Sequence, residues 1–283
     1  TKMVSVFREV RRILRDDGVL FLNVGDSYAM STKGADGVGK QHSNAGSVMQ
    51  DRSWRIPPGI KPKDLIGIPW LLAFALRADG WYLRQDIIWA KPNPMPESVT
   101  DRCTKAHEYL FLLTKNARYW YDAEAVKEKS IDPEGSAKRY ESPFWENGKH
   151  QTGGYSATGA KHTAGIKQFD GQRNRRSVWS IASQPFSGAH FATMPKKLVE
   201  PCILAGCPVG GTVLDPFNGA ATVGIVALEH GRQYLGIELN PEYVGLSVGR
   251  LTDATRQGQL FSLPPIPRPA PIAQQTPLFE ADA

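Results

Sequence analysis

The apolar and polar positions of the first 122 residues predict two helices and three strands. Residues 3–15 carry apolar side chains at helical spacing, and 19–26 form a short apolar run typical of a buried strand. A buried helix is expected over 62–80, closed by a glycine at its end. Two further runs, 81–91 and 107–122, are rich in aromatic and β-branched residues and favour strands.

The region from 195 onward has a more regular pattern, in which helices and strands alternate. The predicted elements are a helix over 195–206, a strand over 211–215, a helix over 220–231, a strand over 233–238 and a helix over 241–254. Alternation of this kind is typical of an α/β protein with a mostly parallel sheet.

Three segments lack such a pattern. Residues 27–62 are rich in Ser, Gly, Lys and Pro and are expected to form a long loop. Residues 123–177 are polar, glycine-rich and basic, which indicates an inserted lobe. From Gln257 the chain becomes proline-rich, and a disordered tail is expected over 257–283.

Composition narrows the function only slightly. The 283 residues carry a net charge of +6 with a pI near 9.2, which is compatible with a nucleic-acid partner and equally with a basic soluble protein. The three cysteines are odd in number and form no CxxC pair, so a reduced intracellular protein is expected. No apolar run approaches the roughly 18 residues of a membrane span, and no signal peptide is visible.

The acids at two strand ends are the strongest candidate site. Asp215 ends one predicted strand and opens the turn Asp-Pro-Phe-Asn-Gly, and Glu238 ends the next strand. Ligands of α/β sheets bind beyond the carboxyl ends of the strands, where Glu238 would bind ribose hydroxyls and Asp215 would face an ammonium group or ordered waters. On these residues alone a plain tight turn with two solvated acids is equally open. A nicotinamide cofactor is disfavoured because the GxGxxG pattern is absent.

Several motifs in a fixed order together resemble one family. "DPFNGAAT" and "YLGIELNPEY" are similar to the first two cofactor motifs of S-adenosylmethionine-dependent DNA amino-methyltransferases. "HFATMPKKLVEPCI" (190–203) resembles the segment before the first motif. Residues 80–122 resemble the family's paired strands, and 14–28 resemble the strand after its catalytic strand. The catalytic half comes first, as in the β-type arrangement of the family.

The resemblance implies a Rossmann-like methyltransferase sheet with helices on both faces, an α/β fold, plus an irregular inserted recognition lobe. It divides the chain into a catalytic half (1–122), a target-recognition region (123–177), a cofactor-binding half (178–256) and the tail (257–283). The implied cofactor is S-adenosylmethionine. The implied cofactor-binding residues are Asp215, Pro216, Phe217, Gly219, Ala221, Thr222, Glu238, Phe191 and Thr193.

Two departures from the family pattern affect what is expected. The family usually has glycine where Ala221 stands, so its methyl group is expected to crowd and weaken cofactor binding. The catalytic Asp/Asn/Ser-Pro-Pro-aromatic tetrapeptide is absent, since "IPPG" (56–59) and "LPPI" (263–266) lack its polar and aromatic residues. The tetrapeptide and the strand before it are expected just upstream of Thr1, so no catalytic residue is assigned in this chain.

Double-stranded DNA is the implied substrate, in which an exocyclic amine of adenine or cytosine is methylated. The candidate DNA-contacting residues are Trp54, Arg55, Arg102, Arg173, Arg175 and Arg176. Asn93, Arg102, His107 and Glu108 match the paired-strand motif, where DNA contact and hairpin packing are both open. Cys202 is expected to be a buried structural thiol rather than a nucleophile.

The resemblance also implies a cytoplasmic protein of bacterial or phage origin, with a restriction enzyme as one further partner. In the tail, "QLFSL" (259–263) and "QTPLF" (275–279) resemble peptides that dock on the replication sliding clamp, with Leu278 and Phe279 as apolar anchors and Gln275 setting the register. Two alternatives stay open: an RNA methyltransferase of the same fold, and a non-catalytic DNA-binding relic that retains the cofactor turn.

Overall fold

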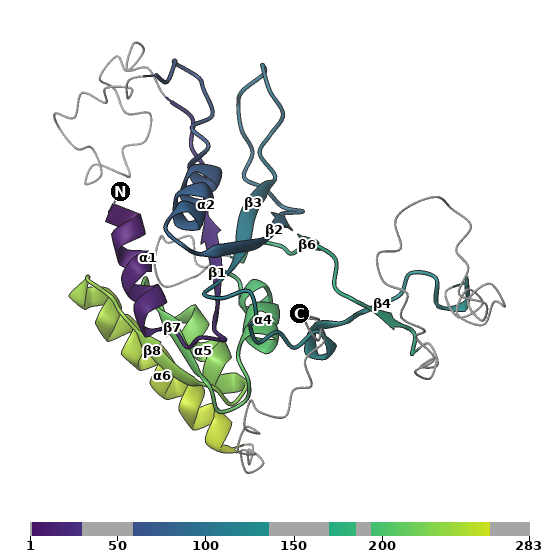
Figure 1. The fold of residues 1–283 in the computed structure, drawn as a ribbon, viewed down its shortest axis with the longest axis vertical. Coiled ribbons are helices and arrows are strands. Elements are labelled where there is room, and N and C mark those ends of the chain that lie inside the picture. The colour runs from purple at the N-terminus through teal and green to yellow at the C-terminus, as the bar shows by residue number, and fades with distance from the viewer. Residues whose placement is uncertain (1, 30–58, 136–169, 185–193, 261–283) are drawn as a thin grey trace, which may run out of the picture. The chain divides into compact units, whose positions relative to one another are not determined.

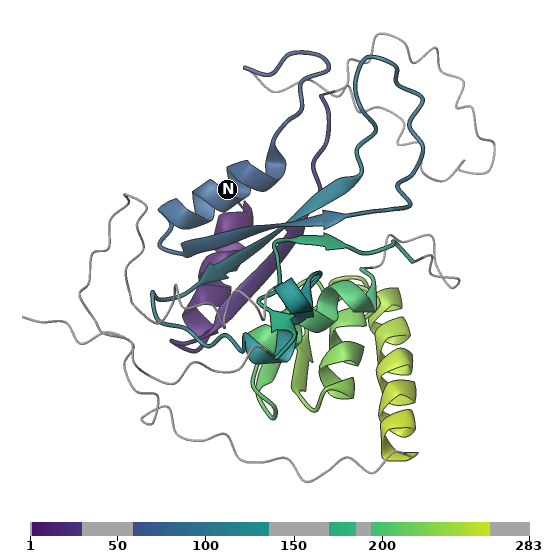
Figure 2. The same cartoon turned by 90° about the vertical axis from the view of Figure 1, so that its right-hand side faces the viewer.

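The computed structural model describes residues 2–29, 59–135, 170–184 and 194–260. The chain folds into two compact units (Figure 1, Figure 2). Unit 1 comprises Thr1–Trp120 and Ser177–Leu198, and unit 2 comprises Tyr121–Arg176 and Val199–Ala283.

Unit 1 is built on a four-stranded sheet in the order β1-β3-β2-β6. Its strands are β1 (Val19–Val24), β2 (Tyr82–Ala90), β3 (His107–Thr114) and β6 (Val178–Ser180). β3 runs antiparallel to both β1 and β2, and only β6 pairs in parallel, with β2. The expectation of a mostly parallel sheet is therefore wrong for this unit, because β2 and β3 are consecutive strands that fold back on each other.

The core of unit 1 lies along β3, whose residues from Leu110 to Thr114 are all buried. α1 (Lys2–Ile13) buries Phe7, and α2 (Ile68–Ala78) buries Leu76, with side chains that are at most 1% exposed. The helices pack against each other, and α2 packs against β2. The stacked rings of Tyr109 and Phe111 both meet the edge of Trp70 from α2. Aromatic burial of this kind fixes α2 on the sheet.

The start of α2 differs from the sequence-based expectation for a reason that is remote in sequence. The helix begins at Ile68, after Gly67 in a left-handed conformation, and not near residue 62. Its first amides, those of Gly67 and Ile68, donate to Oδ1 of Asp26 at 3.0 Å each. Asp26 follows β1, so a carboxylate from a distant segment performs the capping that a local side chain usually provides.

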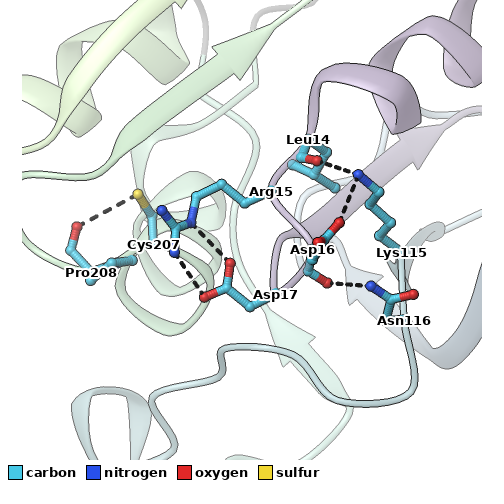
Figure 3. Close-up of polar contacts among 8 residues, drawn as sticks. All are labelled: Leu14, Arg15, Asp16, Asp17, Lys115, Asn116, Cys207 and Pro208. Carbon is cyan, nitrogen blue, oxygen red and sulfur yellow. Dashed lines mark hydrogen bonds and ion pairs between the residues drawn. The ribbon is translucent and has the colours of Figure 1, made fainter. Parts of the chain in front are cut away.

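The turn between α1 and β1 is held against the end of β3, as Figure 3 shows. Nζ of Lys115 donates to the Leu14 carbonyl at 2.7 Å and pairs with Oδ1 of Asp16 at 3.1 Å. The Asn116 side chain donates to the Asp16 carbonyl at 2.8 Å. Side chains that satisfy turn carbonyls in this way keep β1 in register with β3.

Unit 2 contains two parallel strands, β7 (Thr212–Asp215) and β8 (Gln233–Gly236). α5 (Thr222–Glu229) connects them and packs on both, and α6 (Pro241–Leu260) packs on α5. α4 (Lys196–Gly206) precedes β7 along the chain. The sequence-based bounds are close for all five elements, although α6 continues to Leu260 rather than ending at 254. A short antiparallel pair, β4 (Glu128–Lys129) with β5 (Gln172–Arg173), follows the 3-10 turn η2 (Glu124–Val126).

One edge of β1 and one edge of β7 have no strand partner within the described residues. β1 pairs with β3, and β7 pairs with β8. The strand that is expected just upstream of Thr1 stays a prediction. Among the described helices, none has both the length and the apolar composition needed to cross a membrane.

Candidate cofactor-binding site

The turn after β7 is joined to the segment after β8 by backbone hydrogen bonds. The Ile237 amide donates to the Asp215 carbonyl at 2.9 Å, and the Asn218 amide donates to the Ile237 carbonyl at 3.0 Å. Oδ1 of Asp215 accepts the Phe217 amide at 3.0 Å, an Asx turn that explains the acid before Pro216. Two parallel strands thus end at one edge with their connecting segments in contact.

Glu238 lies beside this turn and uses both carboxylate oxygens. Oε2 accepts the Gly219 amide at 2.7 Å, and Oε1 accepts the Asn240 amide at 2.9 Å. The backbone donors of Asn240 and Gly219 lower the pKa of Glu238, so the group is charged at neutral pH. Each oxygen can accept a second hydrogen bond, which leaves capacity for a ligand with hydroxyl groups.

Asp215 has the opposite electrostatic character. Burial raises the pKa of its carboxyl, the charge of Glu238 raises it further, and the Phe217 amide only partly opposes both. A buried carboxylate that resists ionisation gains from a cation placed next to it. The pair therefore offers one acid suited to a positive group and one suited to hydroxyl groups.

Two residues of the turn adopt left-handed backbone conformations. Gly219 has φ of +48°, and Ala221, directly before α5, has φ of +57°. Ala221 is 0% exposed, so a ligand has no surface of its methyl group to contact. Alanine in place of the family's usual glycine therefore introduces backbone strain of about 1–2 kcal/mol, because its φ is left-handed. The burial of its methyl group argues against the expected crowding of the cofactor. Ala221 has no capping side chain, and the first amides of α5 lack intrahelical partners.

The structure brings together most of the predicted cofactor residues. Asp215, Gly219 and Glu238 are linked by the hydrogen bonds above, and the ring of Phe217 is 55% exposed beside them. Pro216 lies within the turn, and Thr222 opens α5. Phe191 and Thr193 lie outside the described residues.

Two hydrogen bonds around this turn were not predicted from the sequence. Oδ1 of Asn218 accepts the Tyr234 hydroxyl, and the guanidinium of Arg250 donates to the Ala220 carbonyl. No local pattern links Asn218 to a tyrosine on β8 or Ala220 to an arginine on α6. Only the fold places them together.

Arg102, a predicted DNA contact, is held by its own unit. Its guanidinium pairs with Glu97 and lies 3.9 Å from the ring centroid of Tyr28. Its side chain is 28% exposed, and a guanidinium has five donors, so this pairing does not exhaust its capacity. Arg102 thus fastens the segment between β2 and β3 to the segment after β1.

Two of the predicted DNA-contacting residues of unit 2, Arg173 and Arg176, share one acid. Nε of Arg173 and Nε of Arg176 both reach Oε1 of Glu128, at 2.9 and 2.6 Å. The positive charge of Arg175 acts on Cys202 of α4 and opposes the effect of burial on that thiol. Trp54 and Arg55 lie outside the described residues.

Residues of the paired strands mainly support packing within unit 1. Asn93 exchanges hydrogen bonds with the Ser183 backbone, accepting at 3.0 Å and donating at 3.2 Å. Glu108 pairs with Lys91 and accepts from Asn23 at 3.2 Å. The ring of His107 meets Tyr109 edge-on. These contacts favour the packing alternative.

Cys202 behaves as a structural thiol in unit 2. Burial raises the pKa of its thiol to about 12. The thiolate, which is the nucleophilic form, is therefore scarce at neutral pH.

Comparison with known proteins identifies close relatives. Residues 1–248 match the family model described as DNA methylase. The Type II methyltransferase M.Cfr9I of Citrobacter freundii is 47% identical over 251 residues, which are 88% of this chain and 70% of that protein. M.SmaI of Serratia marcescens is 45% identical over 249 residues, 88% of this chain and 72% of that protein.

Solved structures confirm the Rossmann-like methyltransferase fold. The cytosine-N4-specific PvuII DNA methyltransferase matches with a TM-score of 0.54 and 18% identity, over 90% of this chain and 74% of that one. TTHA0409 of Thermus thermophilus in complex with S-adenosyl-L-methionine matches with a TM-score of 0.50 and 20% identity, over 89% and 76%.

The first prediction concerns the opposite pKa directions of the two acids. Because the folded-state pKa of Asp215 is raised, its stabilising contribution is present below the ordinary value of 3.8 and is lost as pH rises through the folded-state pKa. Asp215→Asn should therefore increase the free energy of unfolding at pH 7, with a gain that shrinks toward pH 4. Urea unfolding from pH 4 to 8 measures this, with exposed Asp253→Asn on α6 as control.

Glu238→Gln should show the reverse sign in the same experiment. The folded-state pKa of Glu238 is lowered, so its contribution is present above 4.5 and is lost as pH falls through the folded-state pKa. If the two variants change stability in the same direction at pH 7, the electrostatic description of the site is wrong.

A second prediction concerns Ala221. Ala221→Gly should change the free energy of unfolding by less than about 1 kcal/mol, in the stabilising direction, because relief of left-handed strain exceeds the entropy gained by the unfolded chain. The matched control is Ala227→Gly, an equally buried residue inside α5, which should lose about 1 kcal/mol. Equal losses in both variants, measured by denaturant unfolding, would contradict the strain at Ala221.

Proposed function

We propose, for a chain that belongs to the DNA methylase family, that the turn Asp215–Gly219 together with Glu238 holds S-adenosylmethionine. The enzyme class transfers a methyl group from this cofactor to an exocyclic amine of adenine or cytosine at a specific DNA site. The observation that carries the assignment is the pair of acids, Asp215 at the end of β7 and Glu238 two residues after β8, of which Glu238 is charged and the pKa of Asp215 is raised.

Each part of the cofactor has a matching group in unit 2. The charged carboxylate of Glu238 retains lone pairs for the two ribose hydroxyls. Asp215, whose ionisation is disfavoured by burial, gains from the positive charge of the methionine end. The half-exposed ring of Phe217 offers an apolar surface to the adenine. The left-handed turn at Gly219 lets a ligand approach the backbone closely.

Methyl transfer to an amine needs alignment more than it needs a covalent enzyme intermediate. The amine lone pair attacks the methyl group in line, and the protein must extrude the base, exclude water and accept the amine's hydrogen bonds. In the family these acceptors belong to the polar-Pro-Pro-aromatic tetrapeptide, which the 283 residues do not contain. Catalytic roles are therefore assigned to no residue of this sequence.

Target recognition is proposed for residues 123–177. This stretch is basic and polar, and its described part presents the cluster of Glu128, Arg173 and Arg176. One carboxylate between two guanidinium groups leaves a net positive charge that suits a DNA phosphate. The family description as DNA methylase favours DNA over RNA as the substrate.

Two further partners are proposed, a restriction enzyme and a sliding clamp. A restriction enzyme that cleaves the same sequence would fit relatives that are named Type II methyltransferases. Docking of Gln275, Leu278 and Phe279 on a sliding clamp concerns residues outside the described part of the chain. Binding of a 270–283 peptide to purified clamp tests that idea, and no detectable binding would end it.

The cofactor assignment predicts a loss of affinity in Glu238→Ala. Removing the charge-assisted hydrogen bonds should raise the dissociation constant for S-adenosylmethionine about tenfold or more. Calorimetry on the folded variant measures this, and Glu242→Ala, an exposed acid in the first turn of α6, is the matched control. Unchanged affinity in Glu238→Ala would remove this residue from the site. Cofactor binding without methyl transfer to DNA would favour the non-catalytic, DNA-binding relic.

The recognition assignment predicts a transfer of specificity. Exchanging residues 123–177 for the corresponding segment of a relative with another target should change which DNA sequence is methylated, because the replaced segment contributes the base contacts. Affinity for S-adenosylmethionine should stay the same, which controls for damage to unit 2. Sequencing of methylated sites on a random-sequence DNA library provides the measurement. Retention of the original specificity would contradict the assignment.

A further inference from the structure

Every residue of the turn between Phe217 and Ala221 has a hydrogen-bonded backbone group. The Phe217 amide donates to Asp215, the Asn218 amide to Ile237 and the Gly219 amide to Glu238. The Ala220 carbonyl accepts from Arg250, and the Ala221 amide donates to the Asn218 carbonyl. Two of these anchoring groups, Asp215 and Glu238, also belong to the proposed cofactor site, whereas Arg250 does not.

Asn218 is the centre of this arrangement. It is 8% exposed, and all four of its polar groups are bonded. Its amide and carbonyl make the backbone bonds just described, and its Nδ2 donates to the Gly219 carbonyl at 3.4 Å. Its Oδ1 accepts the hydroxyl of Tyr234. A buried amide that is fully bonded is rigid, and removal of one partner leaves a costly unpaired group.

Two glycines leave room for the contact between Tyr234 and Asn218. A Cβ at Gly236 would lie 2.6 Å from Oδ1 of Asn218 and 2.8 Å from the Tyr234 oxygen. A Cβ at Gly224 would lie 2.5 Å from a Tyr234 ring carbon and 2.9 Å from Leu251. Both spacings are shorter than side-chain atoms tolerate. Strand β8 and helix α5 are therefore shaped around the phenol at these positions.

Arg250 anchors the same turn from α6. Its guanidinium donates to the Ala220 carbonyl, the residue directly before the left-handed Ala221. Burial lowers the pKa of Arg250, which means that the guanidinium is partly removed from water. A desolvated charge on a backbone carbonyl makes a stronger hydrogen bond than a solvated one.

We propose that Tyr234 and Arg250 are positioning residues that preset the turn 217–221 for S-adenosylmethionine, acting through Asn218 and Ala220. The inference rests on the proposed cofactor site and adds the groups that hold it in its binding conformation. A preorganised turn binds tighter because its ordering cost is met during folding rather than on binding. Neither side chain needs to touch the cofactor for this effect.

Tyr234→Phe and Arg250→Met test the proposal. Phenylalanine keeps the ring beside Gly224 and removes only the hydroxyl, and methionine keeps apolar bulk at position 250. Each should raise the dissociation constant for S-adenosylmethionine about three- to thirtyfold. Calorimetry well below the unfolding transition measures this. Tyr119→Phe, which removes a hydroxyl that accepts from Arg84 in unit 1, should leave affinity within twofold.

Hydrogen exchange separates positioning from a general loss of stability. In both variants the amides of 217–221 should exchange faster while those of β7 and α5 keep their protection. Arg250→Lys, which retains a donor, should recover part of the affinity. In an assay of methyl transfer, the KM for the cofactor should rise while kcat at saturating cofactor stays constant.

A steric variant gives an independent route to the same disruption. Gly236→Ala should displace the phenol from Asn218 and weaken cofactor binding at least as much as Tyr234→Phe. Gly249→Ala on α6, where a Cβ would meet nothing within 4 Å, is the matched control and should have no effect. Affinity within twofold of wild type in Tyr234→Phe, Arg250→Met and Gly236→Ala overturns the inference. Failure of the unmodified protein to bind the cofactor would instead refute the proposed function.

Discussion

The hydrogen bond from the Gly219 amide to Glu238 links the two halves of the cofactor site. A turn that leaves a parallel strand and enters a helix exposes several amides, and each needs a partner. Here one partner is Glu238, which follows the neighbouring strand β8 by two residues. The group proposed to bind the ribose therefore also holds the turn on which the rest of the cofactor would lie. A substitution of Glu238 is therefore expected to change both the affinity for the cofactor and the local structure of the turn.

Asp215 and Glu238 contribute to stability in opposite ways, although they lie at or just beyond the ends of adjacent strands. Backbone donors favour the charged form of Glu238, whereas burial and the charge of Glu238 disfavour the charged form of Asp215. A site that already satisfied both carboxylates would have little to gain from a cationic ligand. The unfavourable ionisation of Asp215 is thus a cost to the free protein that a positive cofactor at the proposed site would offset. The ionised Asp215 carboxyl lowers the stability of the free protein at the proposed binding site, a trade of stability for function that is common at functional sites.

Local sequence patterns predicted those features of the fold that depend on residues close together in the sequence. The bounds of β7, α5 and β8 and the two acids at the strand ends followed from apolar runs and from one turn motif. The partners of the turn did not follow, because Tyr234 reaches Asn218 from β8 and Arg250 reaches Ala220 from α6. The start of α2 was not predicted correctly either, because the group that caps it, Asp26, lies after β1 and is distant in the sequence. The paired strands expected over 80–122 are the antiparallel pair β2 and β3, whereas the antiparallel pairing of β1 with β3 did not follow, because alternation of helices and strands does not specify strand direction.

Three arginines that the sequence predicts as DNA contacts form ion pairs within the protein. Arg102, Arg173 and Arg176 are each paired with an acid of their own unit. An ion pair reduces the net charge offered to a phosphate, so it lowers non-specific attraction to DNA. It also holds the guanidinium in one orientation, which reduces the entropy lost when a DNA contact forms. A site-specific methyltransferase must leave most DNA unmodified. Weaker non-specific attraction to DNA, together with guanidinium groups that are already oriented, would increase discrimination between DNA sites more than it increases affinity for DNA in general.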